Sequence, residues 1–418
     1  MVHYAIAGQA VYGDGIEYYA WLHSVYFDHD LNFKDELTHI YDYRYNNGFP
    51  NAHTNNTPAL TPAGRVGNFH MPGMAILLMP FYALADIIVL CLNFLGAGML
   101  RNGYSNIYQI VSGIGAVFYG ILGIVLTEKT FAYVLSKNKF KNTNLVRAAV
   151  MLVVLASPLF YYLAIDVLNS QFGSFFAVSL FYYILFVIKE NNSKYFWLGL
   201  VAGLAAYVRL QEAALLLPLL IKLAFDYYQK VKLKTLIIYF LIASFTFGVA
   251  LIPLLLAWQY LYGSVLNHPY FIGVLRYPHY VLLGSLFDAT NGLLTKTPLL
   301  LFLLLFFPFS FRKAPKEMFI FFAYFVVQII GIETYGGWPA ASFGGRMYIS
   351  SLPLFFLLSA VLFTKLKKNW LILISVFFIV LNIFNILNFM LFQKQASGNS
   401  KGLEQTTRLK IERFLRQL

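Results

Sequence analysis

An acidic and aromatic stretch near the start of the chain holds the residues best suited to chemistry. Seven of the 18 acidic residues lie before position 43: Asp14, Glu17, Asp28, Asp30, Asp35, Glu36 and Asp42. An isolated carboxylate is costly to bury in an apolar medium, so this density indicates a working surface that faces water. Asp14 lies between Gly13 and Gly15, which allow unusual dihedrals and close backbone approach. We predict that Asp14 is a general base; the alternative is an N-cap for a helix that begins near Ile16.

The other acidic residues of this stretch have structural alternatives that we favour. Glu17 lies three residues after Asp14, so it could share a helix face with a catalytic Asp14, but closing a capping box is the favoured role. Asp28 and Asp30 alternate around His29, a pattern that can bind a metal. A solvated loop is favoured because no tight His and carboxylate cluster of known spacing is present. We therefore assign no metal ligands, and a divalent metal cofactor stays open.

The composition is that of a membrane protein. The chain has 418 residues, of which 59% are hydrophobic and 12% charged, whereas soluble domains have about a quarter charged. The net charge of +13 comes from short basic clusters between apolar runs, which indicates membrane topology and argues against a nucleic-acid partner. The single cysteine, Cys91, excludes a disulfide framework or a cysteine-based metal site within the chain.

Apolar runs predict an all-α polytopic protein in a lipid bilayer. Eleven segments have suitable composition for membrane helices: 73–95, 107–126, 145–165, 171–188, 195–208, 212–226, 235–261, 297–311, 317–333, 347–364 and 370–392. We predict about ten transmembrane helices among them. The expected organisation is an external acidic loop at 1–72, a transmembrane domain at 73–392 with an external loop at 262–296, and a polar tail at 393–418.

The positive-inside rule orients these segments. Lysine and arginine clusters follow every second segment from 107–126 onward, which places those loops in the cytoplasm. The turns at 166–170, 209–211 and 334–346, the loop at 262–296 and the C-terminal tail are then outside. If the acidic arm is also outside, 73–95 cannot cross, and Pro80 would interrupt it, so we predict a re-entrant or juxtamembrane helical hairpin. The alternative is a cytoplasmic arm with 73–95 crossing.

Six motifs follow one another over roughly 13–365: Gly13-Asp14-Gly15 with Tyr18-Tyr19-Ala20-Trp21-Leu22, Phe27-Asp28-His29-Asp30, Phe69-His70-Met71-Pro72-Gly73, Gly199–Gly203 with Val208-Arg209-Leu210-Gln211, Leu286–Leu294 with Thr297-Pro298, and Gly336-Gly337-Trp338 with Gly344-Gly345-Arg346. In this order they resemble the GT-C superfamily of membrane glycosyltransferases, and bacterial relatives of the dolichyl-phosphate-mannose–protein mannosyltransferase and lipopolysaccharide sugar transferase type. The family has a transmembrane helix immediately before the Asp motif. We expect either such a segment upstream of this sequence or a chain that lacks it, in which case activity is in question.

The resemblance implies a glycosyltransferase that moves a hexosyl or pentosyl group from a polyprenyl-phosphate donor to a lipid, polysaccharide or protein acceptor. It implies the outer face of the bacterial inner membrane, with inversion at the anomeric carbon. Rival readings are a transporter or flippase of polyprenyl-linked glycans, a polysaccharide polymerase or ligase, and a structural subunit. Few midplane charges and no visible repeat argue against the transporter, and a polymerase would not share the early Asp motif.

Substrate-binding residues follow from the same resemblance. Arg209 and Arg346 lie at outer helix ends, where an unpaired guanidinium is expensive unless it meets a phosphate. Their alternatives are snorkelling, or pairing of Arg209 with Glu212. A weaker candidate is His70, which is either structural or contacts the donor or acceptor. Arg276 and Lys296 are weaker candidates for binding the phosphate. Tyr335 and Trp338 either belong to the interfacial aromatic belt or stack on a sugar.

Overall fold

The computed structural model describes residues 10–11, 13–39, 60–137, 142–271, 283–338 and 342–392, the side chains of 391 and 392 excepted. Every regular element in these ranges is a helix, and a single isolated bridge joins Leu60 and Val66. In chain order the elements are α2 (Gly15–His23), the π-helix η1 (Ser24–Asp28), α3 (Lys34–Thr38), α4 (Gly73–Phe94), α5 (Asn106–Lys137), α6 (Thr143–Leu155), α7 (Pro158–Ala164), α8 (Gln171–Val187), α9 (Asn192–Val208), η3 (Leu210–Leu215), α10 (Leu216–Tyr228), α11 (Leu233–Tyr262), η4 (Val265–Asn267), α13 (Gly284–Phe287), α14 (Leu293–Lys296), α15 (Pro298–Leu305), α16 (Phe307–Phe311), α17 (Pro315–Tyr335), η5 (Arg346–Ser351), α18 (Leu352–Phe363) and α19 (Lys368–Phe392).

The all-α polytopic architecture is confirmed, but fewer unbroken spans are present than the predicted ten. By length and composition, six helices of the described chain can each cross a membrane: α4, α5, α11, α17, η5 with α18, and α19. A seventh arises if α6 and α7 form one span, although a 76° bend separates them. The number of spans differs because the apolar composition of a segment does not show where its helix is interrupted. The predicted span at 297–311, for example, divides into α15 and α16 where Phe306 leaves helical geometry.

The predicted hairpin at 73–95 is wrong. Residues Gly73–Phe94 form one continuous helix, α4, which passes through Pro80 without ending. Pro80 lies on an exposed face of α4, while Leu78, Tyr82 and Asp86 belong to the buried face. One proline removes one backbone donor, and a long apolar helix packed along its other face tolerates that loss.

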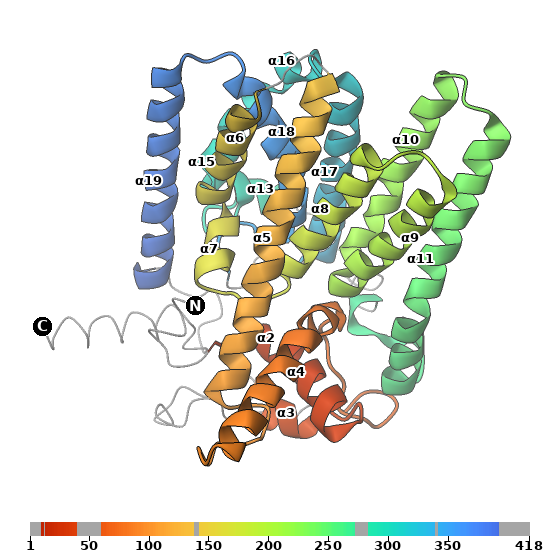
Figure 1. The fold of residues 1–418 in the computed structure, drawn as a ribbon, viewed down its shortest axis with the longest axis vertical. Coiled ribbons are helices and arrows are strands. Elements are labelled where there is room, and N and C mark those ends of the chain that lie inside the picture. Colours follow the sequence, from red (N-terminus) through yellow and green to blue (C-terminus); the bar gives the residue numbers. More distant parts are fainter. Residues whose placement is uncertain are drawn as a thin grey trace, which may run out of the picture.

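Figure 1 shows a bundle whose two ends are built from different helices and turns. Helices α2, α3 and α4 lie together at one end, beside the first turns of α5. The C-terminal end of α5, the α10–α11 turn, the start of α17 and the α18–α19 turn lie at the opposite end (Figure 1). The basic residues of these turns include Lys230, Lys232, Lys313, Lys365 and Lys367. The acidic helices and these basic turns are therefore at opposite ends of the bundle.

Helix length agrees with this arrangement. α5 has 32 residues and is thus about 48 Å long, well beyond the roughly 30 Å of a hydrocarbon core. Its excess length runs beside α4, and Asp86 of α4 is held there by two hydrogen bonds from Arg101, each 2.8 Å, and by one from the Tyr108 hydroxyl at 2.6 Å. This network fixes α4 against the first turns of α5.

Candidate active site

Helix α2 carries the first two site residues at its N-terminal end. Asp14 occupies the N-cap position, but its side chain makes no capping hydrogen bond. Gly13 before it has φ +54°, the left-handed region that glycine adopts without strain. The helix is anchored to the turn before α8, because the Tyr18 hydroxyl donates to Ser170 Oγ at 2.9 Å. Asp14 is therefore free to face the neighbouring helix ends.

The Asp14 carboxylate forms an ion pair with Arg346. Arg346 Nη1 lies 2.5 Å from Asp14 Oδ2, and His70 Nε2 lies 3.6 Å from the same oxygen. The side chain of Asp14 is 30% exposed, whereas those of Arg346 and His70 are 12% and 13% exposed. The residues come from three separate parts of the chain, and they bring one carboxylate and two cationic groups together near the surface.

His70 is held by a second carboxylate and by its own backbone. Its Nδ1 lies 2.7 Å from Glu17 Oε2, and its backbone N–H donates to the same oxygen at 3.2 Å. The Trp21 indole donates to the His70 carbonyl at 2.9 Å, and the Asn68 amide donates to the Glu17 carbonyl at 2.7 Å. The contacts described for the Glu17 side chain thus position His70, and the capping of α2 by Glu17 stays a prediction.

These contacts set the protonation states at the site. Burial acts to raise the pKa of Asp14, but Arg346 and His70 outweigh it and hold that pKa well below its ordinary value. Burial acts to lower the pKa of His70, but Tyr18, Glu17 and Asp14 outweigh it and raise that pKa well above 6.5. At neutral pH the site therefore holds an ionised Asp14 and a His70 imidazolium.

A turn formed by Gly344 and Gly345 positions Arg346 next to Asp14. Gly344 and Gly345 have φ values of +57° and +66°, and η5 begins immediately after them. A Cβ atom on Gly345 would lie 2.8 Å from the Leu293 Cα, so this turn can pack against α14 only without a side chain. Lys296 of α14 flanks the same turn, since its Cβ lies 3.5 Å from a Cβ built on Gly344. Burial lowers the pKa of Lys296, and Asp288 acts in the opposite direction.

Arg209 lies at the end of α9, next to Arg346. Its Nη1 donates to the Arg346 carbonyl at 3.5 Å, and the side chain is half-buried. The alternative pairing with Glu212 is absent from the ion pairs of the described residues. Glu212 instead accepts from Ser174 Oγ at 2.7 Å and from the Tyr324 hydroxyl. Arg209 thus has no carboxylate partner among the described residues.

An aromatic group borders the charged residues. The Tyr335 ring lies 5.2 Å from the Tyr270 ring, and Tyr270 stacks on Phe69 at 4.8 Å, next to His70 in the chain. Tyr335 is also close enough to His70, Arg209 and Arg346 for their charges to act on its hydroxyl. Trp338 is half-buried against the hydrophobic core, and its stacking on a sugar stays a prediction.

The structure therefore brings together most residues that the sequence singled out. Asp14, Glu17, His70, Arg209 and Arg346 form one cluster, which Lys296 and Tyr335 border, and Arg276 lies outside the described residues. Two further residues at the cluster, Asp166, whose charge acts on Arg346, and Tyr270, were not predicted from the sequence. A lone acid in the short turn at 166–170 and an aromatic residue in the loop at 262–296 were the available signals.

Possible metal ligands lie elsewhere. His29 and Asp30 are exposed, as the solvated-loop reading predicts, and His29 Nδ1 lies 3.3 Å from its own turn's Val25 carbonyl. Asp28 instead turns back toward His23 and Glu36, the one group of histidine and carboxylates in the described chain whose ligand atoms lie within 4.8 Å of one another. None of these three is a member of the Asp14 cluster.

A protein-family model matches part of the chain. Residues 107–258, from α5 through most of α11, match the model of the family described as dolichyl-phosphate-mannose-protein mannosyltransferase. No curated protein matches the chain, and no solved structure does. The matched segment is a little over a third of the chain and includes Arg209, while Asp14, His70 and Arg346 lie outside it. Over residues 107–258 the chain is therefore similar to this family of membrane glycosyltransferases, and its apolar helical bundle agrees with a polytopic membrane protein.

Proposed function

We propose that the protein transfers a sugar from a polyprenyl-phosphate donor to a hydroxyl of a glycan, lipid or protein acceptor. The observation that carries this proposal is the half-buried Arg209 guanidinium, which lies beside the Asp14–Arg346 ion pair without a carboxylate of its own in the described chain. Asp14 and Glu17 pair with Arg346 and His70, and the charge of Asp166 also acts on Arg346. Arg209 is the cation left without such a pair, so it favours an anionic ligand, and a lipid-linked phosphate meets that requirement at a membrane surface.

The proposed reaction is a single displacement with inversion. The acceptor oxygen attacks the anomeric carbon, the bond from that carbon to the phosphate oxygen breaks, and the acceptor proton passes to Asp14. The bond electrons leave on the polyprenyl phosphate, whose growing charge is held by Arg209 and Arg346.

The resting ion pair makes Asp14 a weak base, because its pKa is held well below the ordinary value. A donor phosphate that binds Arg346 competes with Asp14 for the guanidinium. The pKa of Asp14 then rises, so donor binding activates the base.

The end of the bundle that carries α2, α3 and α4 is proposed to face outside the bacterial inner membrane. Its acidic residues and the basic turns at the other end fit the positive-inside rule. Within this arrangement α4 is an interfacial helix, because its buried face packs on α2 and α5 while Ile76, Leu84 and Ile87 are exposed and apolar. That position puts the site at the depth of a lipid phosphate.

Two substitutions separate the base from the phosphate ligand. Asp14→Asn is expected to lower kcat by about 10²- to 10⁴-fold, the usual contribution of a general base. Arg209→Ala removes a charge-assisted hydrogen bond to the donor and is expected to raise its KM by about 10- to 100-fold. The assay follows consumption of a radiolabelled polyprenyl-phosphate sugar by membranes that contain each variant.

Asp35→Asn is the matched control, because Asp35 is exposed on α3 and its change removes the same charge. Thermal unfolding in detergent accompanies each assay, since Asp14→Asn also leaves Arg346 unpaired. Arg209→Ala keeps the Asp14–Arg346 pair intact and so reports on donor binding even if Asp14→Asn is unstable. Wild-type kcat in a folded Asp14→Asn protein would exclude the proposed base.

A further inference from the structure

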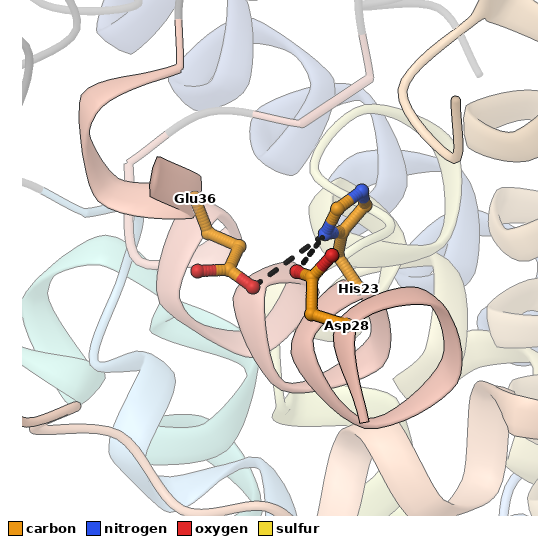
Figure 2. Close-up of side chains that lie close together, drawn as sticks. All are labelled: His23, Asp28 and Glu36. Carbon is orange, nitrogen blue, oxygen red and sulfur yellow. Dashed lines mark hydrogen bonds and ion pairs between the residues drawn. The ribbon is translucent and has the colours of Figure 1, made fainter. Parts of the chain in front are cut away.

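A second cluster of ionisable side chains lies at the other end of α2. His23 is the last residue of α2, Asp28 ends the π-helix that follows, and Glu36 lies in α3. Figure 2 shows both carboxylates directed at one ring nitrogen. His23 Nδ1 lies 2.9 Å from Asp28 Oδ2 and 3.5 Å from Glu36 Oε1.

The other ring nitrogen of His23 fixes the tautomer. Its Nε2 lies 3.2 Å from the backbone carbonyl of Asn102, and a carbonyl can only accept. Nε2 therefore carries a hydrogen, so Nδ1 faces the two carboxylates and is either protonated or bound to a cation. Stacking of the His23 ring on Tyr104, with centroids 4.0 Å apart, holds the ring in this orientation.

Glu36 is the observation that points to a ligand. Its side chain is fully buried, with 0% exposure, yet neither carboxylate oxygen has a hydrogen-bond partner among the described residues beyond the 3.5 Å approach of His23. A proton on His23 Nδ1 would be directed at Asp28, the closer acceptor, and could not also satisfy Glu36. A buried carboxylate without a hydrogen bond is costly, and protonation, an ion pair or a bound metal ion compensates for that cost.

We propose that His23, Asp28 and Glu36 bind a divalent transition-metal ion such as Zn²⁺. One imidazole and two carboxylates suit Zn²⁺ better than Ca²⁺ or Mg²⁺, which prefer oxygen ligands alone. Around a tetrahedral ion with bonds of about 2.0–2.2 Å, neighbouring donor atoms lie about 3.3–3.6 Å apart. The 2.9 and 3.5 Å separations from His23 Nδ1 need only small shifts to match. Water would complete the coordination, because Asp28 is 31% exposed.

The arrangement has the outer contacts of a metal site. A histidine ligand commonly donates its second N–H to a backbone carbonyl, as His23 does to Asn102. The ion would join α2, η1 and α3, and the contact of His23 with Asn102 would tie them to the segment before α5. It would so hold the end of α2 opposite to Asp14. This role is structural, and it is independent of the proposed sugar transfer.

The test measures metal binding by the purified full-length chain in detergent micelles. Chelator-stripped wild type is titrated with Zn²⁺, bound metal is counted by elemental analysis, and Co²⁺ is substituted to obtain its visible spectrum. We expect one ion per chain, a tetrahedral Co²⁺ spectrum and a higher Tm on addition of Zn²⁺. Glu36→Gln and Asp28→Asn, which are nearly isosteric, are expected to weaken Zn²⁺ binding at least tenfold and to abolish the Tm increase.

Asp35→Asn is the control, because it changes an exposed carboxylate next to Glu36. It is expected to bind Zn²⁺ as the wild type does. The proposal is overturned if stripped wild type takes up no stoichiometric ion, or if Glu36→Gln and Asp28→Asn bind as tightly as wild type. Sugar transfer is assayed in parallel, and its loss with metal binding intact would count only against the proposed function.

Discussion

At the scale of residues, the central feature is a chain of charges from Glu17 through His70 and Asp14 to Arg346. Each contact spans two distant parts of the sequence, at 2.7 Å, 3.6 Å and 2.5 Å. A carboxylate on either side of an imidazole stabilises the imidazolium, and a guanidinium beside Asp14 keeps that carboxylate ionised. The protonation of His70 therefore couples the loop before α4 to α2.

This coupling predicts a pH dependence of stability. The pKa of His70 is raised in the folded chain, so its contribution is complete below the unfolded value of about 6.5 and is lost as pH rises toward the folded pKa. We expect the difference in unfolding free energy between wild type and His70→Gln, followed through Tm, to be largest below about pH 6.5. Above that pH this free-energy difference should shrink by up to about 1.4 kcal/mol per pH unit.

His268→Gln is the control for this titration. Burial, with a smaller contribution from His70, lowers the pKa of His268 to about 3, so it is uncharged in the folded chain above pH 6.5. Its depressed pKa costs stability only as pH falls below about 6.5, and the wild-type gap for His268→Gln should stay constant from about pH 7 to 9. A His70→Gln gap that is equally constant there would show that His70 is not protonated at neutral pH.

At the scale of elements, the start of α4 and the end of α9 determine how far His70 is from Arg209. Gly73 is the first residue of α4, and a Cβ atom there would lie 2.3 Å from the carbonyl carbon of Tyr207 and the nitrogen of Val208. Backbone atoms cannot move aside cheaply. The two helix ends therefore approach this closely only because residue 73 is glycine.

Gly73→Ala is expected to separate the two helix ends. The clash should lower stability by about 1–3 kcal/mol and reduce sugar transfer more than the stability loss alone explains, because His70 and Arg209 move apart. Thermal unfolding and the transfer assay measure the two effects. Gly248→Ala in α11 is the control, since nothing lies within 4 Å of a Cβ there. It should leave transfer unchanged and raise stability by about 0.5–1 kcal/mol, the usual gain for alanine over glycine inside a helix. Wild-type stability and transfer in Gly73→Ala would show that the contact between the start of α4 and the end of α9 does not require glycine.

At the scale of the whole molecule, charge is divided between the two ends of the bundle. Acidic helices α2 and α3 and the Asp14 cluster lie at one end, and the basic turns lie at the other (Figure 1). A bilayer across the bundle would place these ends in different compartments.

This division predicts the outcome of surface labelling. In a Cys91→Ser background, which removes the single native cysteine, Asp35→Cys should react with an impermeant maleimide in right-side-out vesicles. Lys313→Cys, in the turn before α17, should react only after the vesicles are opened. The two positions are controls for each other. Reaction of both in sealed vesicles, or the reverse pattern, would contradict the proposed orientation.

The sequence by itself determined the all-α membrane architecture, since apolar runs and a low charged fraction admit few other folds in a bilayer. It also singled out Arg209 and Arg346, because charged residues at helix ends in such a protein need a partner or a function. Asp14 was singled out by its place in the acidic stretch, its flanking glycines and the family resemblance. Local patterns could not show that Pro80 leaves α4 intact, because packing along the other face of the helix decides that.

Only the tertiary structure decided which charges meet. Asp14 and Arg346 are more than 300 residues apart, so their ion pair depends on the packing of α2 against the turn before η5. The same is true of His23, Asp28 and Glu36, where a π-helical turn and α3 direct two carboxylates at one nitrogen. Spacing along a chain reports only neighbours on one element. Contacts between elements depend on the free energy of packing them together, which no local pattern contains.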